Sequence, residues 1–438
     1  MEWVEIQVSE SVFQGLIQRF PRRTEFVAII RTRRTTSRPL TQTHWKAAIT
    51  GLVLGVVAAL FIGKLPPAIP ALRTEFGLSL MESGWLVSMF NTLGVIASIF
   101  MGLFTARVGA WRFCMFGLAC LAGGGLLGAA AHSVGWLLAG RFFEGVGMLV
   151  VVVAAPALIT MATAPADRKT VFSFWGGYMP TGTALGMLLA PPLIAASGWR
   201  ALWVVVSLCA LVTIVLLYSQ RRDYASASAA QPAGGTAWRD AAGPLRRAGP
   251  WWIALSFSCY VFNFYAIMVW MPTFMIGERQ MALTTASLLT ALMVAANIPG
   301  NILGGMLMQR GVSRGANVSL AGVITALTCM VVFAGGLPDW LRYLASVAFS
   351  FGVGLLPGSI MSASQTHAKN PAQIGTVQGM LMQGSNVGQF VSPLLVTAAV
   401  AQAGSAALDW HRMLGLMLAS SAVIVVCGQV IRRIERRL

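Results

Sequence analysis

The chain has 438 residues, of which 56% are hydrophobic and only 10% are charged. Soluble domains carry about 25% charged residues, so this composition, with a mean hydropathy of +0.72, excludes an ordinary soluble protein. The net charge of +17 would suit a nucleic-acid partner. That partner is excluded because the basic residues lie in short segments between long apolar runs, where they report membrane topology instead.

Apolar runs long enough to cross a bilayer recur along the whole chain. About 20 apolar residues span the hydrocarbon core as a helix, and the alternation of apolar and polar residues that marks a membrane β-barrel is missing. We therefore predict an all-α membrane protein with twelve transmembrane helices. The expected spans are 47–70, 83–105, 111–131, 135–162, 170–196, 200–219, 251–274, 284–308, 316–335, 340–363, 373–400 and 411–431.

The segments outside these spans define the domain organisation. The first segment is rich in arginine and is expected to be a solvated cytoplasmic tail, although Phe13 to Phe20 could form an amphipathic helix on the inner leaflet. A segment rich in Ala, Gly, Pro and Arg is expected to be a flexible cytoplasmic linker. The predicted divisions are the tail 1–46, a six-helix half 47–219, the linker 220–250, a second six-helix half 251–431 and a cytoplasmic tail 432–438.

The distribution of Lys and Arg predicts that both termini lie in the cytoplasm. Each expected outer loop then holds a single basic residue: Arg73, Arg200, Arg279, Arg342 and Arg412. Apart from Lys64 and Arg141, which lie within spans, all other basic residues fall in the inner segments. This asymmetry satisfies the positive-inside rule.

The two halves repeat each other at a shift of about 202 residues. Gly182-Thr-Ala-Leu-Gly186 recurs as Gly384-Ser-Asn-Val-Gly388. Further pairs follow in the same order: Pro70 with Pro272, Pro156 with Pro357, Gly102 with Gly305, and Arg107 with Arg310. Six spans per copy give both halves the same orientation, so the repeat predicts halves related by an axis along the membrane normal that rock about a central site.

The loop between the second and third spans carries the first specific resemblance. Gly102-Leu-Phe-Thr-Ala-Arg107-Val-Gly109-Ala-Trp-Arg112 resembles a signature of the major facilitator superfamily, and Gly305-Met-Leu-Met-Gln-Arg310 resembles its second copy. The resemblance implies a conformational role for Gly102, Arg107, Gly109, Arg112, Gly305 and Arg310. The acid of the family signature is replaced by Ala106 and Gln309, which puts the family's charge latch at the inner side in question.

A second signature is intact on the fourth span, where Gly140-Arg141-Phe-Phe-Glu144-Gly145-Val-Gly147 matches the family. A third, typical of proton-driven exporters, retains only Gly177, Gly186 and Pro191, which argues against a drug exporter. The end of the first span, from Lys64, is similar to bacterial solute permeases of the cyanate-permease-like branch. The resemblance covers residues 47–431 and implies the twelve-helix fold, alternating access and a bacterial inner-membrane location.

Three ionisable residues fall within the spans and away from their ends: Lys64, Arg141 and Glu144. Such residues are costly in lipid and usually mark a substrate or proton pathway. Their places in the first and fourth spans put them at similar depth. We expect Lys64 and Arg141 to bind an anionic substrate and Glu144 to carry a coupled proton. The alternative is that Arg141 pairs with Glu144 only to pack the fourth helix, and that Lys64 extends to the outer surface.

Polar and aromatic side chains in other spans could complete the substrate site. The candidates are Asn91, Tyr178, Asn263, Asn297, Gln378 and Asn386. Aromatic residues such as Trp175, Tyr260 and Tyr265 could also face the central cavity. The alternative for the amides is that they hold neighbouring helices together.

The sequence thus predicts a secondary transporter of a small organic or inorganic anion, coupled to protons. A proton-driven exporter of drugs or metabolites is the alternative. No phosphate-binding loop and no catalytic or metal-ligand pattern is present, so neither ATP-driven transport nor an enzyme is expected. The expected partners are a small-molecule substrate, the lipid bilayer and a proton. No cofactor, metal or nucleic acid is expected, and the protein is expected to act as a monomer.

Overall fold

The computed structural model describes residues 42–437, apart from 229–241, 335, 370 and 402–408. Almost all regular structure in these ranges is helical. The first half contains α3 (Trp45–Gly63), α4 (Leu65–Phe76), α5 (Leu80–Met89), α6 (Thr92–Val108), α7 (Ala110–Ala129), α8 (Val134–Ala162), α9 (Arg168–Trp175) and α10 (Tyr178–Ser219). The second contains α13 (Ala248–Arg279), α14 (Leu283–Ala295), α15 (Asn297–Gln309), α16 (Arg314–Val332), α17 (Asp339–Ile360), α18 (Ala363–His367), α19 (Pro371–Val400) and α20 (His411–Glu435).

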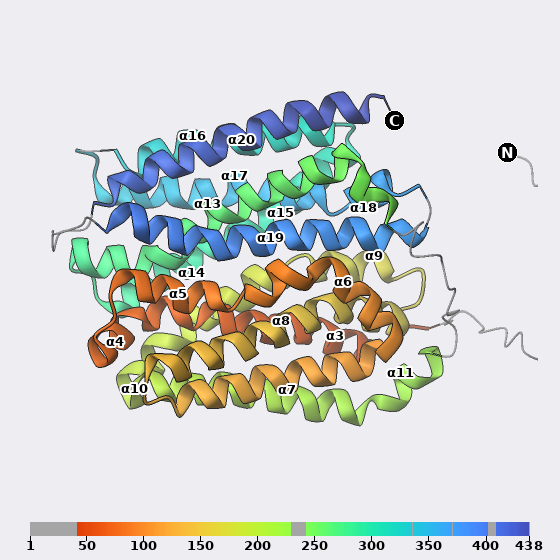
Figure 1. Ribbon diagram of the computed structural model, residues 1–438, viewed down its shortest axis with the longest axis horizontal. Coiled ribbons are helices and arrows are strands. Elements are labelled where there is room, and N and C mark those ends of the chain that lie inside the picture. The colour runs from red at the N-terminus through yellow and green to blue at the C-terminus, as the bar shows by residue number, and fades with distance from the viewer. Residues whose placement is uncertain (1–41, 229–241, 335, 370, 402–408, 438) are drawn as a thin grey trace, which may run out of the picture.

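The helices form two bundles that lie side by side (Figure 1). In that view α3 to α10, coloured red to yellow-green, occupy the lower bundle, and α13 to α20, green to blue, the upper one. The long helices of both bundles run along the same axis. Where the bundles meet, α19 lies against α5 and α6: the Ser88 hydroxyl donates to the Phe390 carbonyl at 2.7 Å, and the Asn386 amide donates to the Ser98 hydroxyl at 3.2 Å.

The twelve-helix prediction is confirmed. Among the described residues, 10 helical stretches are long and apolar enough to cross a membrane. One of them, α10, has 42 residues and turns at Gly198, where φ is 76°, so it supplies both the fifth and the sixth crossing. A further crossing is α19, whose 30 residues pack along α13 and α6. Pairs of shorter helices, such as α3 with α4, form single crossings that are interrupted midway.

The internal repeat is visible in how helices touch within each half. Gly182 lies so close to α3 that a Cβ atom would overlap the carbonyl of Val56, and Gly384 stands in the same relation to Ala254 on α13. Gly186 and Gly388 repeat this contact one turn later. Small residues let membrane helices approach until their backbones touch. The repeated glycines therefore make the same close contact in both halves, between α10 and α3 in the first and between α19 and α13 in the second.

The described parts of the segment that joins the halves contain two short helices. Residues 221–228 continue as helix α11 (Arg221–Ser228), and Gly243–Arg246 form the short 3₁₀ helix η1. The Tyr224 side chain is buried, and its hydroxyl donates to the Ala47 carbonyl at 2.7 Å, which fixes α11 to the start of α3. Sequence composition missed this anchor because a single tyrosine supplies it. The expected amphipathic segment Phe13 to Phe20 lies outside the described residues.

Two expected boundaries also move. The first helix begins at Trp45 and so includes the last two residues assigned to the N-terminal tail, and α20 runs on to Glu435, beyond the expected end of the last span. Both helices continue through basic residues beyond the apolar run, whereas the predicted spans end where the apolar run ends.

Candidate substrate site

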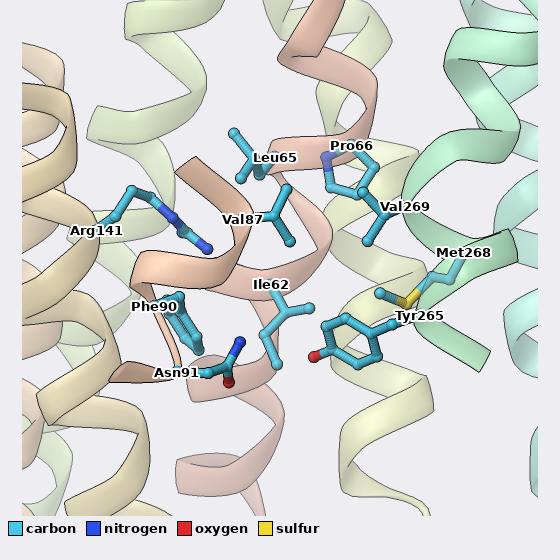
Figure 2. Close-up of a pocket in the computed structure, with 10 residues that line it drawn as sticks. All are labelled: Ile62, Leu65, Pro66, Val87, Phe90, Asn91, Arg141, Tyr265, Met268 and Val269. Atoms are coloured by element: carbon cyan, nitrogen blue, oxygen red, sulfur yellow. The ribbon is translucent and has the colours of Figure 1, made fainter. Parts of the chain in front are cut away.

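A small cavity lies between the two halves at the middle of the bundle. Its residues come from α3, α4, α5, the turn between α5 and α6, and α8 on one side, and from α13 on the other: Ile62, Leu65, Pro66, Val87, Phe90, Asn91, Arg141, Tyr265, Met268 and Val269 (Figure 2). Its volume is about 10 Å³, which is room for about one water molecule. The structure therefore shows the halves closed around this point.

Helix breaks in both neighbouring crossings expose backbone groups at the cavity. The first crossing is interrupted at Lys64 because Pro66 and Pro67 lack the N–H groups that a regular helix would place on the preceding turn. The second is interrupted at Phe90 and Asn91, where the Asn91 N–H bonds to Ser88 at 2.8 Å instead of one residue further back. Such breaks in membrane helices occur where freed backbone groups find other partners.

Arg141 is that partner for both breaks. Its Nη1 donates to the Phe61 carbonyl at 2.9 Å, and its Nε donates to the Leu86 carbonyl at 3.2 Å. The guanidinium also lies 4.4 Å from the centre of the Phe90 ring. Figure 2 shows this side chain reaching toward the cavity from α8. Arg141 is 3% exposed, so it is fixed from several sides and preorganised.

Glu144 joins the two cations behind the cavity. One carboxylate oxygen accepts from Arg141 Nη1 at 2.5 Å and the other accepts from Lys64 Nζ at 2.6 Å. Lys64 and Glu144 are both fully buried. The remaining space around the Lys64 ammonium is filled by the rings of Phe61 and Trp203, at 4.5 Å and 4.4 Å, an arrangement that favours a cation.

The structure thus brings the three predicted ionisable residues into one cluster with a net charge of +1. Arg141 lines the cavity, whereas Lys64 lies behind it and reaches it only through Glu144. Asn91 also lines the cavity, and within the described chain its side chain has no hydrogen-bond partner. Arg141 Nη2 likewise has none among the described residues, so the cavity retains donors that no protein group satisfies.

The other predicted polar residues lie in three different settings. Asn263 contacts Ser421 at 3.4 Å and Asn297 donates to the Ser350 carbonyl at 3.0 Å, so both hold helices together inside the second half. Asn386 connects the halves through Ser98, and half-buried Gln378 lies beside Met361.

Tyr178 stacks on Trp175 at the start of α10, with ring centroids 4.4 Å apart. It lies within electrostatic range of Tyr265, although it does not line the cavity. The two tyrosines come from different halves, on α10 and α13.

One residue of the site was missed by sequence reasoning. Gln389 is buried, and its Oε1 accepts a 2.6 Å hydrogen bond from the Tyr265 hydroxyl. Tyr265 is in turn close enough to Arg141 for the two to interact electrostatically. Gln389 lies three residues after Asn386 and four after Ser385, so it belongs to a polar face of the eleventh helix. Gln378 and Asn386 of this helix were predicted as site residues, but Gln389 was not.

The signature residues at the inner end have mixed settings. Gly109 and Gly311 have φ of 89° and 87°, a conformation that favours glycine, so the turn of the signature is present in both halves. Arg112 and Arg310 are exposed. The surroundings of Gly102 and of the Arg107 side chain lie outside the described part of the chain, and Gly305 on α15 is half-buried.

An unexpected ion pair closes the inner end of the second half. Arg314 is buried and pairs with Glu435 at the end of α20, while His367 Nε2 lies 3.1 Å from the same carboxylate. Arg314 also donates to the Ser359 carbonyl at 3.0 Å. This ion pair lies within the second half and joins α16 to α20, a contact between distant helices that the local signature could not reveal.

Twelve membrane helices in two parallel halves around a central cavity define a membrane transport protein. The sequence profile of the Major Facilitator Superfamily matches residues 51–393, and the chain belongs to this family. It is a transporter and not an enzyme.

Curated relatives and solved structures agree with this assignment. A Bacillus subtilis protein named as a candidate niacin/nicotinamide transporter is 24% identical over 86% of this chain and 94% of its own length. A probable sulfoacetate transporter of Cupriavidus necator is 26% identical over 81% of this chain and 88% of its own. A bacterial homologue of the human lysosomal transporter Spinster, solved in an inward-facing conformation, has a TM-score of 0.70 at 14% identity, covering 89% of this chain and 96% of that one. The structural likeness concerns the fold.

Proposed function

We propose that this protein is a proton-coupled secondary transporter of a small organic anion in the bacterial inner membrane. The observation that carries the proposal is the buried cluster of Lys64, Arg141 and Glu144, whose net charge is positive and whose Arg141 lines a cavity shared by both halves. A buried net charge is costly, and an anion bound at Nη2 of Arg141 would neutralise it. A guanidinium also matches a carboxylate or sulfonate in geometry.

The names of relatives support an organic acid. Besides the niacin and sulfoacetate proteins, a cis,cis-muconate transport protein of Acinetobacter baylyi is 24% identical over 82% of this chain, and a hexuronate transporter of Bacillus subtilis is 21% identical over 80%. All four names include an acid with at least one carboxylate or sulfonate group. Their shared chemistry matches a site whose free donors belong to an arginine.

Glu144 is the proposed coupling residue. A proton on Glu144 would cancel the only negative charge of the cluster and leave Lys64 and Arg141 to attract the substrate anion. Anion binding and proton binding would then favour each other, because the two linkages are reciprocal. The name of a partial relative, an arabinose-proton symporter of Escherichia coli, is consistent with proton coupling.

The alternative, a proton-driven exporter of cationic or hydrophobic compounds, has less support. Such a transporter needs a membrane carboxylate that can meet the substrate. In the described spans Glu144 is the acid at this depth, it is fully buried, and both of its oxygens contact cations.

Uptake into proteoliposomes tests the proposal. Nicotinate, glucuronate, sulfoacetate and cis,cis-muconate are supplied outside, with an inward proton gradient or without one. The parent protein is expected to accumulate at least one of them, faster with the gradient. Glu144→Gln is expected to abolish the effect of the gradient, and Arg433→Gln, at an exposed arginine in the last turn of α20, to leave uptake unchanged. Accumulation of organic cations alone would contradict the proposal.

A further inference from the structure

The charge of the site limits the charge of its ligand. At the depth of the cavity, the described residues of the first half carry two cations and one carboxylate, and each cation contacts the carboxylate. The described spans of the second half place no ionisable acid or base at that depth. Its buried cluster of Arg314, Glu435 and His367 lies at the inner end of α16, α18 and α20.

The wall opposite Arg141 is neutral and already hydrogen bonded. The Tyr265 hydroxyl donates its proton to Gln389 Oε1 at 2.6 Å, and Gln389 Nε2 donates to the Ser385 hydroxyl at 3.0 Å. Tyr265 is 1% exposed and lines the cavity (Figure 2). A phenol has one proton to donate, so its oxygen presents lone pairs to a ligand and accepts a hydrogen bond.

We infer that the substrate is a monoanion whose uncharged end carries a hydrogen-bond donor, with the anionic group at Arg141 and the donor at Tyr265. Gln389 is then a positioning residue: it accepts the Tyr265 hydroxyl proton and thereby leaves the lone pairs of the Tyr265 oxygen to accept from the ligand. This inference rests on the proposed anion transport and narrows it. The anionic group pairs with Arg141, whereas the second acid of a dianion would lie against the acceptor oxygen of Tyr265, where the described second half offers no cation to pair it. Burying that unpaired charge is costly whether or not Glu144 carries a proton.

The inference divides the relatives by chemistry. Sulfoacetate and cis,cis-muconate carry two acidic groups, whereas nicotinate and hexuronates carry one. Of the two monoanions, a hexuronate offers hydroxyl donors to Tyr265, whereas the ring nitrogen of nicotinate can only accept a hydrogen bond. The inference therefore favours a hydroxylated monoanion such as a hexuronate.

Matched pairs of ligands provide the test. Each pair exchanges a neutral donor for a second acid on the same parent chain or ring: gluconate with glucarate, 3-hydroxybenzoate with isophthalate, and glycolate with sulfoacetate. Binding to the purified full-length protein is measured by titration calorimetry. In every pair that binds, the monoanion is expected to bind about tenfold tighter or more. A dianion that binds equally well or better would overturn the inference while leaving anion transport intact. Failure of every member to bind or be transported would remove the proposed function as well.

Two variants sharpen the result. Tyr265→Phe is expected to weaken binding of the hydroxylated member about tenfold, the loss of one hydrogen bond, and to leave benzoate, which lacks the donor, unaffected. Tyr224→Phe, at a buried tyrosine that bonds to Ala47 far from the cavity, is the matched control. Equal losses for 3-hydroxybenzoate and benzoate in Tyr265→Phe would contradict the role of Tyr265.

Discussion

The two halves share a fold and a repeat, yet they differ in where they bury charge. The first half places Lys64, Arg141 and Glu144 beside the cavity in the middle of the bundle. The second half has neutral hydrogen bonds there, such as Tyr265 with Gln389, and buries its Arg314–Glu435 ion pair at the inner end.

This difference indicates a division of labour within a duplicated fold. Packing is conserved: Gly182 and Gly384 make equivalent close contacts in the two halves. Charge is not conserved, because a second positive cluster facing the first would cost energy through like-charge repulsion in a low-dielectric interior. One half can then hold the anion, while the other contacts its uncharged part and moves relative to it.

The largest expected effect comes from breaking the central cluster. Glu144→Leu leaves Lys64 and Arg141 as two unpaired buried cations, which is expected to lower the free energy of unfolding by about 3–5 kcal/mol. Asn297→Ala removes only neutral hydrogen bonds in the second half, to the Ser350 carbonyl and from Asn301 and Tyr260, and is expected to cost about 1–2 kcal/mol. Thermal unfolding of the two detergent-solubilised variants makes the comparison. Similar decreases in the free energy of unfolding for both variants would show that the central charges stabilise the fold no more than a neutral hydrogen bond does.

Part of this contrast could be predicted from the sequence, namely the part that depends on local patterns and not on contacts between distant helices. Long apolar runs and basic loops predicted the twelve crossings, and rare intramembrane charges predicted Lys64, Arg141 and Glu144. Their grouping was only partly predictable: the i,i+3 spacing suggested the pairing of Arg141 with Glu144, but nothing local connected Glu144 with Lys64, 80 residues earlier. Gln389 and Glu435 were missed because their roles depend on partners from distant helices.

A smaller effect is expected from Lys64→Met, which tests whether net charge or only Arg141 matters. The remaining Arg141–Glu144 pair is neutral, and the methionine fits the aromatic surroundings of Phe61 and Trp203. The protein is therefore expected to stay folded. Anion affinity is expected to fall on the order of tenfold to a hundredfold from the lost Coulomb attraction. Calorimetry with the best-bound anion measures it, and unchanged affinity would make Lys64 a packing residue only.

The smallest expected effect concerns the inner cluster of the second half. Glu435→Gln leaves Arg314 with its bond to the Ser359 carbonyl, and Glu435 is 16% exposed, so water can compensate part of the loss. A decrease of about 1–2 kcal/mol in unfolding free energy is expected, with anion affinity unchanged. A fall in affinity equal to that of Lys64→Met would place substrate chemistry in both halves.

The central claim is that the anion binds to the charge of the first half. Its most direct test is the dissociation constant of one bound anion for two matched variants, Arg141→Gln and Arg314→Gln. Both replace a buried arginine that contacts a glutamate and a backbone carbonyl. The account predicts that Arg141→Gln weakens binding at least about a hundredfold while Arg314→Gln binds as the parent does. Parent-like binding by Arg141→Gln, or an equal loss in both variants, would contradict it.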